Sequence, residues 1–375
     1  LAPTEAELAQ IFLGAYFHRV PSDDLARLNP EALYASALSH LDLARQRQPG
    51  QPLLRAYNPT ETQAGGTNPH TVVEAVVDDM AFLVDSASMV LNRLGYTIHL
   101  TIHPVLDVSR DNNGNLIALN HRSADARHES FLCFHISRES RGERLDTIIY
   151  ELTRVLSEVS AANTDDMAMG ELALSLAHNL DSAHMPGDDE TRSEAAALCR
   201  WIAQENFTFL GAVRYEKSSD NDDLLSPKAT SALGILRPRD GLDLIERLSV
   251  LPESTAADLK DTDPVMITKS SKRSLVHRPA YMDVLFVRHW NASGQLTGET
   301  CLVGLFSAGA YNRSVVDIPG SRQKLQHVLT RSGLPEQGHG IKVLHNLIER
   351  YPRDDLFQIT KNELYDTAMG MLELQ

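Results

Sequence analysis

The chain contains 375 residues, of which 42% are hydrophobic and 23% are charged, the composition of an ordinary globular protein with room for two or three domains. Its 50 acidic and 35 basic residues give a net charge of −15. Nonspecific binding to nucleic acid or to an anionic membrane requires a basic surface, so we expect neither as a partner.

Cysteine usage and hydropathy indicate a cytoplasmic protein. Cys133, Cys199 and Cys301 are odd in number and far apart, which predicts neither a disulfide framework nor a paired-cysteine zinc site. No apolar run approaches the ~20 residues of a membrane span. The first residues, LAPTEAELAQ, lack the charged start and apolar core of a signal peptide.

The N-terminal part is expected to be helical. Residues 1–48 show short helical patterns interrupted by Pro21, Pro30 and Pro49. Residues 58–70, NPTETQAGGTNPH, have the composition of a linker. We therefore predict a first segment, residues 1–65, that consists of helices and a linker.

A strand, a helix and a second strand are predicted next. Residues 71–77 are β-branched and apolar, and Asp78 or Asp79 can cap the helix that follows. Apolar residues recur at helical spacing from Leu83 to Leu94, and Gly95 ends the helix. From Thr97 the period falls to two, which predicts a strand.

Further elements complete a small α/β domain over residues 66–165. Residues 111–114, DNNG, predict a hairpin turn, and residues 115–119 are the candidate returning arm. Residues 129–137 alternate as a strand, and a helical stripe runs from Leu145 to Val159. The order βαββα is the ACT or ferredoxin-like plan without its final strand, which could come from elsewhere in the chain.

The remaining chain predicts a helical connector, a second β-rich domain and a helical end. Helices are expected at 167–180 and about 189–204, within a connector of residues 166–206. A second β-rich domain, ACT- or PAS-like, covers 207–310 and contains a long hairpin of residues 280–290 and 295–306. Residues 311–375 are mostly helical, and a capping box at 360–363 opens a helix whose apolar stripe suggests a fragment of a longer protein. The fold class is therefore α+β, an ACT/ferredoxin-like unit followed by a β-rich unit with flanking helices.

Histidines and a basic stretch are the other candidates for chemistry. His99 and His103 lie four residues apart on a predicted strand, ~13 Å from each other, too far to share one metal ion. We therefore expect no metal site and read Thr97, His99, Thr101 and His103 as a polar sheet face that could contact another subunit. A concentrated basic stretch could bind an anion or dock onto another domain; it comprises Lys269, Lys272, Arg273, His277 and Arg278.

Several long motifs resemble the N-terminal region of the large-type NAD-dependent glutamate dehydrogenases of bacteria. They are VVDDMAFLVDSASMVLNRLGYTIHLTIHPVLDVSRD (76–111), ENFTFLGAVRYE (205–216), TKSSKRSLVHRPAYMD (268–283), AYNRSVVDIPGSRQKLQHVL (310–329) and YPRDDLFQITKNELYDTA (351–368). The resemblance implies a regulatory and assembly region ahead of a catalytic domain that this chain lacks. It also implies the reaction of the whole enzyme, in which L-glutamate, NAD and water give 2-oxoglutarate, ammonium and NADH, and it implies sister subunits as partners.

The resemblance directs attention to the first strand–helix loop, where ACT-like domains hold amino acids. Here an aspartate can bind an α-ammonium group and helix N–H groups a carboxylate. The candidate effector residues are Asp78, Asp79, Met80, Phe82 and Leu83. The aspartates could instead cap the helix, which is the ordinary role of such residues, and adjacent side chains diverge too much for a catalytic pair.

No dinucleotide-binding fingerprint is present, because the nearest run, Gly338-His339-Gly340, is too short and follows no predicted strand. We therefore predict that this segment has no catalytic residues and no cofactor of its own, while the whole enzyme uses NAD. Two alternatives remain. One is a self-standing amino-acid-sensing adaptor, and the other is an enzyme that uses the histidine-rich sheet.

Overall fold

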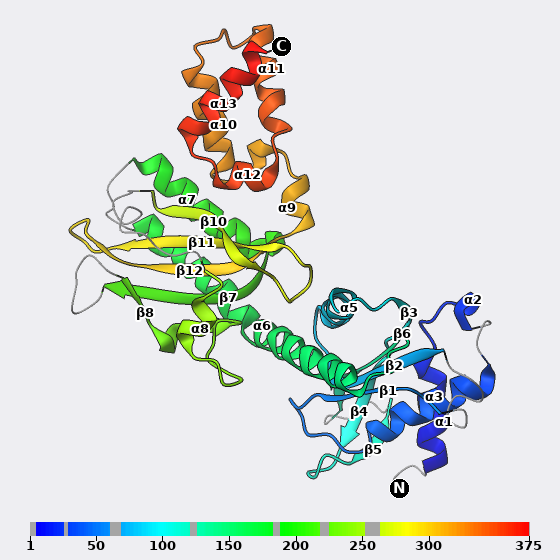
Figure 1. The fold of residues 1–375 in the computed structure, drawn as a ribbon. Helices are drawn as coiled ribbons and strands as arrows, with labels where there is room; N and C mark the ends of the chain where they lie inside the picture. The colour runs from blue at the N-terminus through cyan, green and yellow to red at the C-terminus, as the bar shows by residue number, and fades with distance from the viewer. Residues whose placement is uncertain are drawn as a thin grey trace. The chain divides into compact units, whose positions relative to one another are not determined.

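The structure, a computed structural model, describes residues 5–25, 29–60, 69–120, 126–182, 188–217, 225–251 and 263–374. The chain divides into two compact units. The first consists of Leu1–Ser160 together with Leu275–Pro279, and the second of Ala161–Ser274 and Ala280–Gln375. Figure 1 labels the elements along the chain.

The first unit contains one antiparallel sheet. Its strands are β1 (Leu53–Tyr57), β2 (His70–Asp78), β3 (Ile98–Ile102), β4 (Val105–Arg110), β5 (Leu116–Leu119) and β6 (Arg127–Ser137). The order is β1-β2-β6-β4-β5, and β3 pairs with β6 as well. The predicted βαββα order is present, formed by β2, α5 (Leu83–Arg93), the interrupted strand β3/β4, β6 and α6 (Gly142–Ser182). The final strand of the plan is supplied by β1, which precedes these elements in sequence and pairs with β2.

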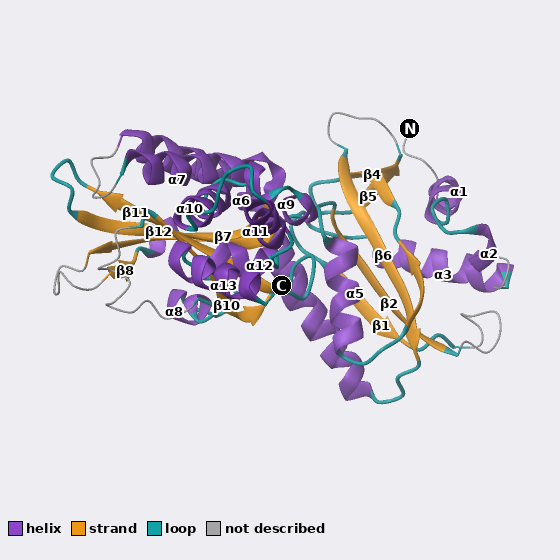
Figure 2. Ribbon diagram, turned by 90° about the horizontal axis from the view of Figure 1, so that it is seen from above, coloured by secondary structure: helices purple, strands orange, loops and turns teal. Residues whose placement is uncertain are grey.

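Helices cover both faces of this sheet, as Figure 2 shows. On one face lie α1 (Glu5–Tyr16) and α3 (Pro30–Leu43), which bury Phe12, Tyr16 and Leu41 against Val72 and Phe131. On the other face lie α5 and the first part of α6. The predicted N-terminal helices therefore exist, with the short α2 (Ser22–Leu25) between them, and they belong to the core of the first unit.

The predicted aspartate cap of α5 is wrong. The residue that precedes the helix is Phe82, in the left-handed conformation with φ of 70°, and no side chain caps the helix. The two aspartates lie too far upstream, because residues 79–82, which end in a turn at Ala81 and Phe82, separate β2 from α5. The predicted end is confirmed, since Gly95 has a φ of 90° and directly follows the C-cap residue Leu94.

The second unit contains another antiparallel sheet. Its strands are β7 (Phe207–Lys217), β8 (Leu225–Pro227), β9 (Leu233–Gly234), β10 (Val265–Arg273), β11 (Tyr281–Trp290) and β12 (Leu296–Phe306). The order is β10-β11-β12-β7-β8, with β9 on β7. The long hairpin is confirmed by the pairing of β11 with β12, and Gly294, with φ of 77°, closes its turn.

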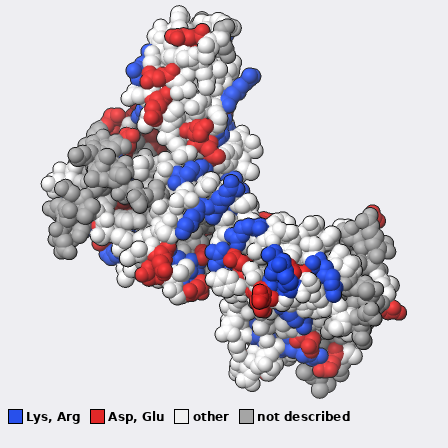
Figure 3. All heavy atoms as spheres, viewed as in Figure 1, with Lys and Arg blue, Asp and Glu red and all other residues white. Residues whose placement is uncertain are grey.

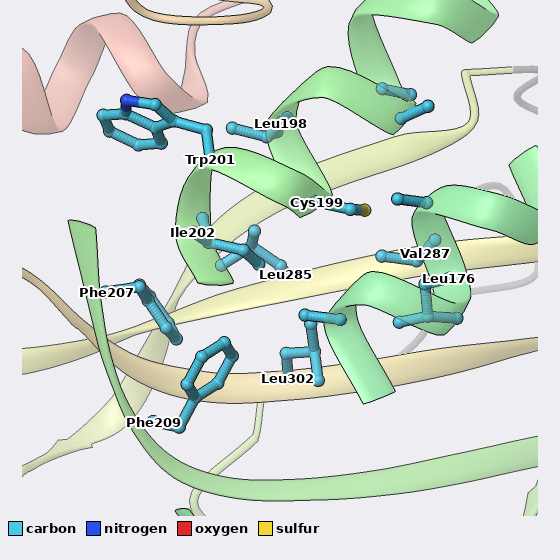
Figure 4. Close-up of a cluster of buried hydrophobic side chains, with 14 of the residues drawn as sticks. Leu176, Leu198, Cys199, Trp201, Ile202, Phe207, Phe209, Leu285, Val287 and Leu302 are labelled. Carbon is cyan, nitrogen blue, oxygen red and sulfur yellow. The ribbon is translucent and has the colours of Figure 1, made fainter. Parts of the chain in front are cut away.

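Helices pack on this sheet from one side, as Figure 4 shows in close-up. Leu176 of α6 and Leu198 of α7 (Asp189–Trp201) belong to one buried cluster with Phe209, Leu285 and Leu302 of the strands. The predicted helix at 167–180 is not separate, because α6 runs for 41 residues without a break. A kinked segment, Ile202–Asn206, in which Glu205 has a φ of 62°, leads from α7 into β7.

The remaining elements are short or form the helical end. They are the 3-10 turns Ala229–Ser231 and Val315–Asp317, α8 (Leu244–Leu248), α9 (Ala308–Asn312), α10 (Ser321–Arg331), α11 (His339–Glu349), α12 (Arg353–Gln358) and α13 (Lys361–Glu373). The capping box of Thr360 and Glu363 is confirmed. Leu364 and Ala368 of α13 are buried in a core of this helical end, while Met371 is exposed.

Candidate functional site

The aspartates of the β2–α5 loop have different partners. Asp78 accepts hydrogen bonds from Arg47 Nη1 (2.9 Å) and from the Gly50 N–H (2.7 Å). Burial alone would raise the pKa of Asp78, but the hydrogen bond and charge of Arg47 hold it below its usual value. Arg47 also pairs with Glu129, which Arg110 holds through two more bonds. Asp78 is therefore part of a buried ionic network and is committed to structure.

Asp79 starts a hydrogen-bonded chain on the other face of the sheet. The Ser130 hydroxyl donates to Asp79 Oδ1 (2.6 Å), and His103 Nε2 lies 2.9 Å from the same hydroxyl. Ser130 is fully buried on β6, whereas Asp79 is exposed. Burial lowers the pKa of His103, Asp79 opposes that shift and Arg19 adds to it. The pKa of His103 is therefore influenced by an acidic and a basic group, Asp79 and Arg19.

The other predicted effector residues line the same loop with different exposure. Met80 and Phe82 are half-buried, and Leu83 is buried with 2% of its surface exposed. The Phe82 ring lies 4.7 Å from the ring of His277, measured between centroids. His277 comes from the segment of residues 275–279, which belongs to the first unit. One residue of the predicted basic stretch therefore contacts one residue of the predicted effector loop.

The rest of the basic stretch contacts groups of the same chain. Lys269 Nζ lies 2.7 Å from a carboxylate oxygen of both Asp283 and Asp354. Figure 3 shows acidic and basic side chains interspersed over the visible face. Lys272 Nζ lies 2.9 Å from Ser249 Oγ, and the Arg273 guanidinium lies 5.2 Å from the centroid of the Tyr281 ring.

The prediction that Thr97, His99, Thr101 and His103 form one polar face is wrong. Strand β3 ends at Ile102, so His103 lies outside it, at the interruption before β4. His103 contacts Ser130, whereas the His99 ring lies 4.4 Å from that of His70. His70 and Ser130 lie on opposite faces of the sheet according to the β2–β6 register. His121, a further histidine that follows this strand in the sequence, lies outside the described residues.

A buried cluster near α3 has the residue types of a metal site. His40, Glu74 and Cys133 offer ligand atoms within 4.8 Å of one another. Both nitrogens of His40 are engaged, Nδ1 with Tyr16 OH (2.8 Å) and Nε2 with a backbone carbonyl of β2 (3.2 Å), and Glu74 pairs with Arg55. Burial raises the pKa of Cys133, which disfavours the thiolate that a metal ion requires. The cluster is therefore a closed hydrogen-bond network that joins α1 and α3 to the sheet.

Comparison with known proteins identifies the family. The model of the glutamate dehydrogenase ACT1 domain matches residues 12–152, and that of glutamate dehydrogenase helical motif 1 matches residues 318–375. The NAD-specific glutamate dehydrogenases of Halomonas elongata and Pseudomonas aeruginosa are 33% and 32% identical to this chain over 97% of its length. The chain belongs to the NAD-specific glutamate dehydrogenase family.

The match covers a limited part of each relative. The chain spans 23% of the Halomonas and Pseudomonas enzymes, and 22% of the Mycobacterium tuberculosis enzyme, to which it is 24% identical. A solved structure described as an RNA-binding light-oxygen-voltage receptor aligns with a TM-score of 0.14 and 12% identity, too low to support any conclusion. Among the described residues, no helix combines the length and apolarity needed to cross a membrane.

Sequence reasoning missed the partners of the loop. Ser130 and His103 meet Asp79 only because β6 brings together segments 51 residues apart in sequence. His277 carried a signal, since it belongs to the basic stretch, but nothing in the sequence placed it against Phe82. Pro104, directly after His103, is the one local clue that the strand is interrupted there.

Proposed function

We propose that this chain is the regulatory and assembly segment of an NAD-dependent glutamate dehydrogenase. The whole enzyme would convert L-glutamate, NAD and water to 2-oxoglutarate, ammonium and NADH, with catalysis and NAD binding outside this segment. The family membership supports the activity, because the matched relatives are named NAD-specific glutamate dehydrogenases. The partners are the remaining polypeptide and sister subunits, and we infer a cytoplasmic location.

We infer that the ACT unit binds a free amino acid at the β2–α5 loop. The observation that carries this proposal is the chain of Asp79, Ser130 and His103, in which one carboxylate oxygen of Asp79 is fixed by Ser130 and the side chain is exposed. A fixed, exposed carboxylate suits an α-ammonium group. The ligand's own carboxylate would be held by the uncapped N–H groups of α5. Asp78 takes no part in this proposal, because Arg47 already holds it.

The test is a thermal-shift screen of the twenty amino acids at millimolar concentration on the 375-residue chain. An amino acid that binds only the folded state raises the melting temperature progressively with concentration. Asp79→Asn should remove this response, because the amide keeps an acceptor for Ser130 but loses the negative charge. Asp107→Asn is the matched control, since it neutralises a carboxylate of the same sheet whose partner is His128.

The result has a clear failing outcome. If no amino acid raises the melting temperature, or if Asp79→Asn responds as the unmodified chain does, the loop is not an amino-acid site. The self-standing adaptor that remained as an alternative predicts the same binding, so it is separated by another observation. If the native protein carries the catalytic region on the same polypeptide as this segment, the dehydrogenase proposal is supported. If the native protein lacks that region, the dehydrogenase proposal is contradicted.

A further inference from the structure

The loop between β10 and β11 has an unusual conformation at its tip. The Ser274 N–H donates to the Ala280 carbonyl (2.8 Å) and closes the loop. Within it, the Arg278 N–H donates to the Val276 carbonyl (2.9 Å), so His277 is the centre of a three-residue turn, and its φ is 68°. Residues other than glycine rarely adopt this left-handed backbone region, and such turns are strained. The surrounding contacts must therefore hold the tip in place.

Those contacts are with the first turns of α5. The His277 N–H donates to Ser86 Oγ at 3.0 Å, and Ser86 is fully buried. The His277 ring lies 4.7 Å from the Phe82 ring, and its Nδ1 lies 3.5 Å from Asp85 Oδ2. Val276, beside it, is 1% exposed. A backbone hydrogen bond to a buried hydroxyl and a buried apolar side chain make this a specific attachment.

The residue that receives the tip is strained as well. Phe82 has a φ of 70° at the start of α5, where no side-chain cap is present. Two residues in the left-handed region, Phe82 and His277, therefore lie ring against ring. Phe82 follows Asp79 by three positions, so a ligand beside Asp79 must be accommodated by the turn that Phe82 ends.

We propose that residues 275–279 form a latch, which docks on Phe82 and Ser86 and couples the order of the β2–α5 loop to the β10–β11 hairpin. This inference concerns regulation of the amino-acid site and rests in that respect on the proposed function. Docked and released forms of the latch are the two states, and an effector that favours one of them shifts the equilibrium by its difference in affinity. Lys269 on β10, the first strand of this hairpin, pairs with Asp354 of α12.

Hydrogen exchange measured by mass spectrometry on the 375-residue chain tests the latch without any ligand. Ser86→Ala removes the acceptor of the His277 N–H, and His277→Gly removes the ring while it keeps a residue suited to positive φ. Each variant should speed exchange roughly tenfold in two peptides together, residues 79–86 and residues 274–280, because local opening releases both. Thr71→Val is the matched control, since Thr71 Oγ1 is buried and accepts the Glu139 N–H at 2.9 Å, away from the latch.

Each outcome decides the proposal. Faster exchange in both peptides for both variants, with the control unchanged there, supports the latch. A change confined to one peptide, or an equal change in Thr71→Val, overturns it. An amino acid that stabilises the chain through Asp79 should also alter exchange in residues 274–280; if it alters only residues 79–86, the coupling is wrong while the proposed function stands. If no amino acid binds, the proposed function fails and the ligand-free variants still decide the latch.

Discussion

At the scale of single residues, buried uncharged histidines make stability depend on pH. Burial, with His70 and His99 nearby, lowers the pKa of His135 to about 4, and burial lowers that of His40 to about 3. The pKa of a histidine in an unfolded chain is about 6.5. Between these values the unfolded chain binds more protons than the folded one. The stability that the uncharged histidines contribute is therefore complete above about pH 6.5 and is lost as the pH falls toward about 4.

His135→Leu should separate this effect from ordinary packing. The Nε2 atom of His135 is buried without a hydrogen-bond partner, so an apolar side chain should be tolerated at neutral pH. The difference in unfolding free energy between the variant and the unmodified chain should be ~1–2 kcal/mol more favourable to the variant at about pH 4.5 than at about pH 7. Urea unfolding at both pH values measures it, with the exposed His18→Leu as control. An equal difference at both pH values would contradict the predicted titration.

Asp79 shows how tertiary structure reassigns a residue. Its position before a helix predicts a cap, yet α5 begins at Leu83 and the carboxylate accepts from Ser130 instead. Neutralising it therefore should not weaken the helix through loss of a cap. The stability effect of Asp79→Asn should be small, because the amide oxygen still accepts the Ser130 hydroxyl.

At the scale of elements, the β4–β5 turn depends on one glycine. Gly114 has a φ of 81°, and a Cβ there would lie 2.4 Å from the Arg47 carbonyl oxygen. That backbone cannot move freely, since the Arg47 N–H donates to the Gly114 carbonyl at 2.9 Å. Gly114→Ala therefore combines a disfavoured conformation with a collision between backbone atoms.

We expect Gly114→Ala to destabilise the chain by ~2–4 kcal/mol. The matched variant is Gly95→Ala, because Gly95 also has positive φ, at 90°, but a Cβ there meets open space. It should cost only ~1 kcal/mol, the conformational part alone. Chemical denaturation of both variants measures the difference. Equal losses would show that the collision at Gly114 is relieved by local movement.

At the scale of the whole molecule, the segment should lack dehydrogenase activity by itself. Gly338, Gly340 and the intervening His339 lie at the start of α11, after helix α10, so no strand precedes them as a dinucleotide fingerprint requires. The 375-residue chain incubated with L-glutamate and NAD should therefore give no increase in absorbance from NADH. Turnover by a preparation free of host dehydrogenase would contradict the assignment of catalysis to another region.

The sequence by itself determined the elements with strong local signals. Periodicity located β2, α5, β6, the β11–β12 hairpin and α13, because a strand or helix with one buried face repeats its apolar residues at a fixed spacing. Gly95 located the C-terminal end of α5, and the capping box of Thr360 and Glu363 located the start of α13, for the same local reason. The family resemblance also came from the sequence, since its motifs are contiguous.

Only the tertiary structure decided how distant segments meet. Strand β1 completes the first sheet, although the sequence of residues 1–65 predicts helices and a linker. The sequence does not predict this strand because an edge strand of five half-buried residues has no clear period. The division of roles between Asp78 and Asp79 depends on Arg47 and Ser130, which lie 31 and 51 residues away. The contact of His277 with Ser86 joins residues 191 positions apart. Such pairings are fixed by the packing of whole elements, to which local sequence pattern contributes no information.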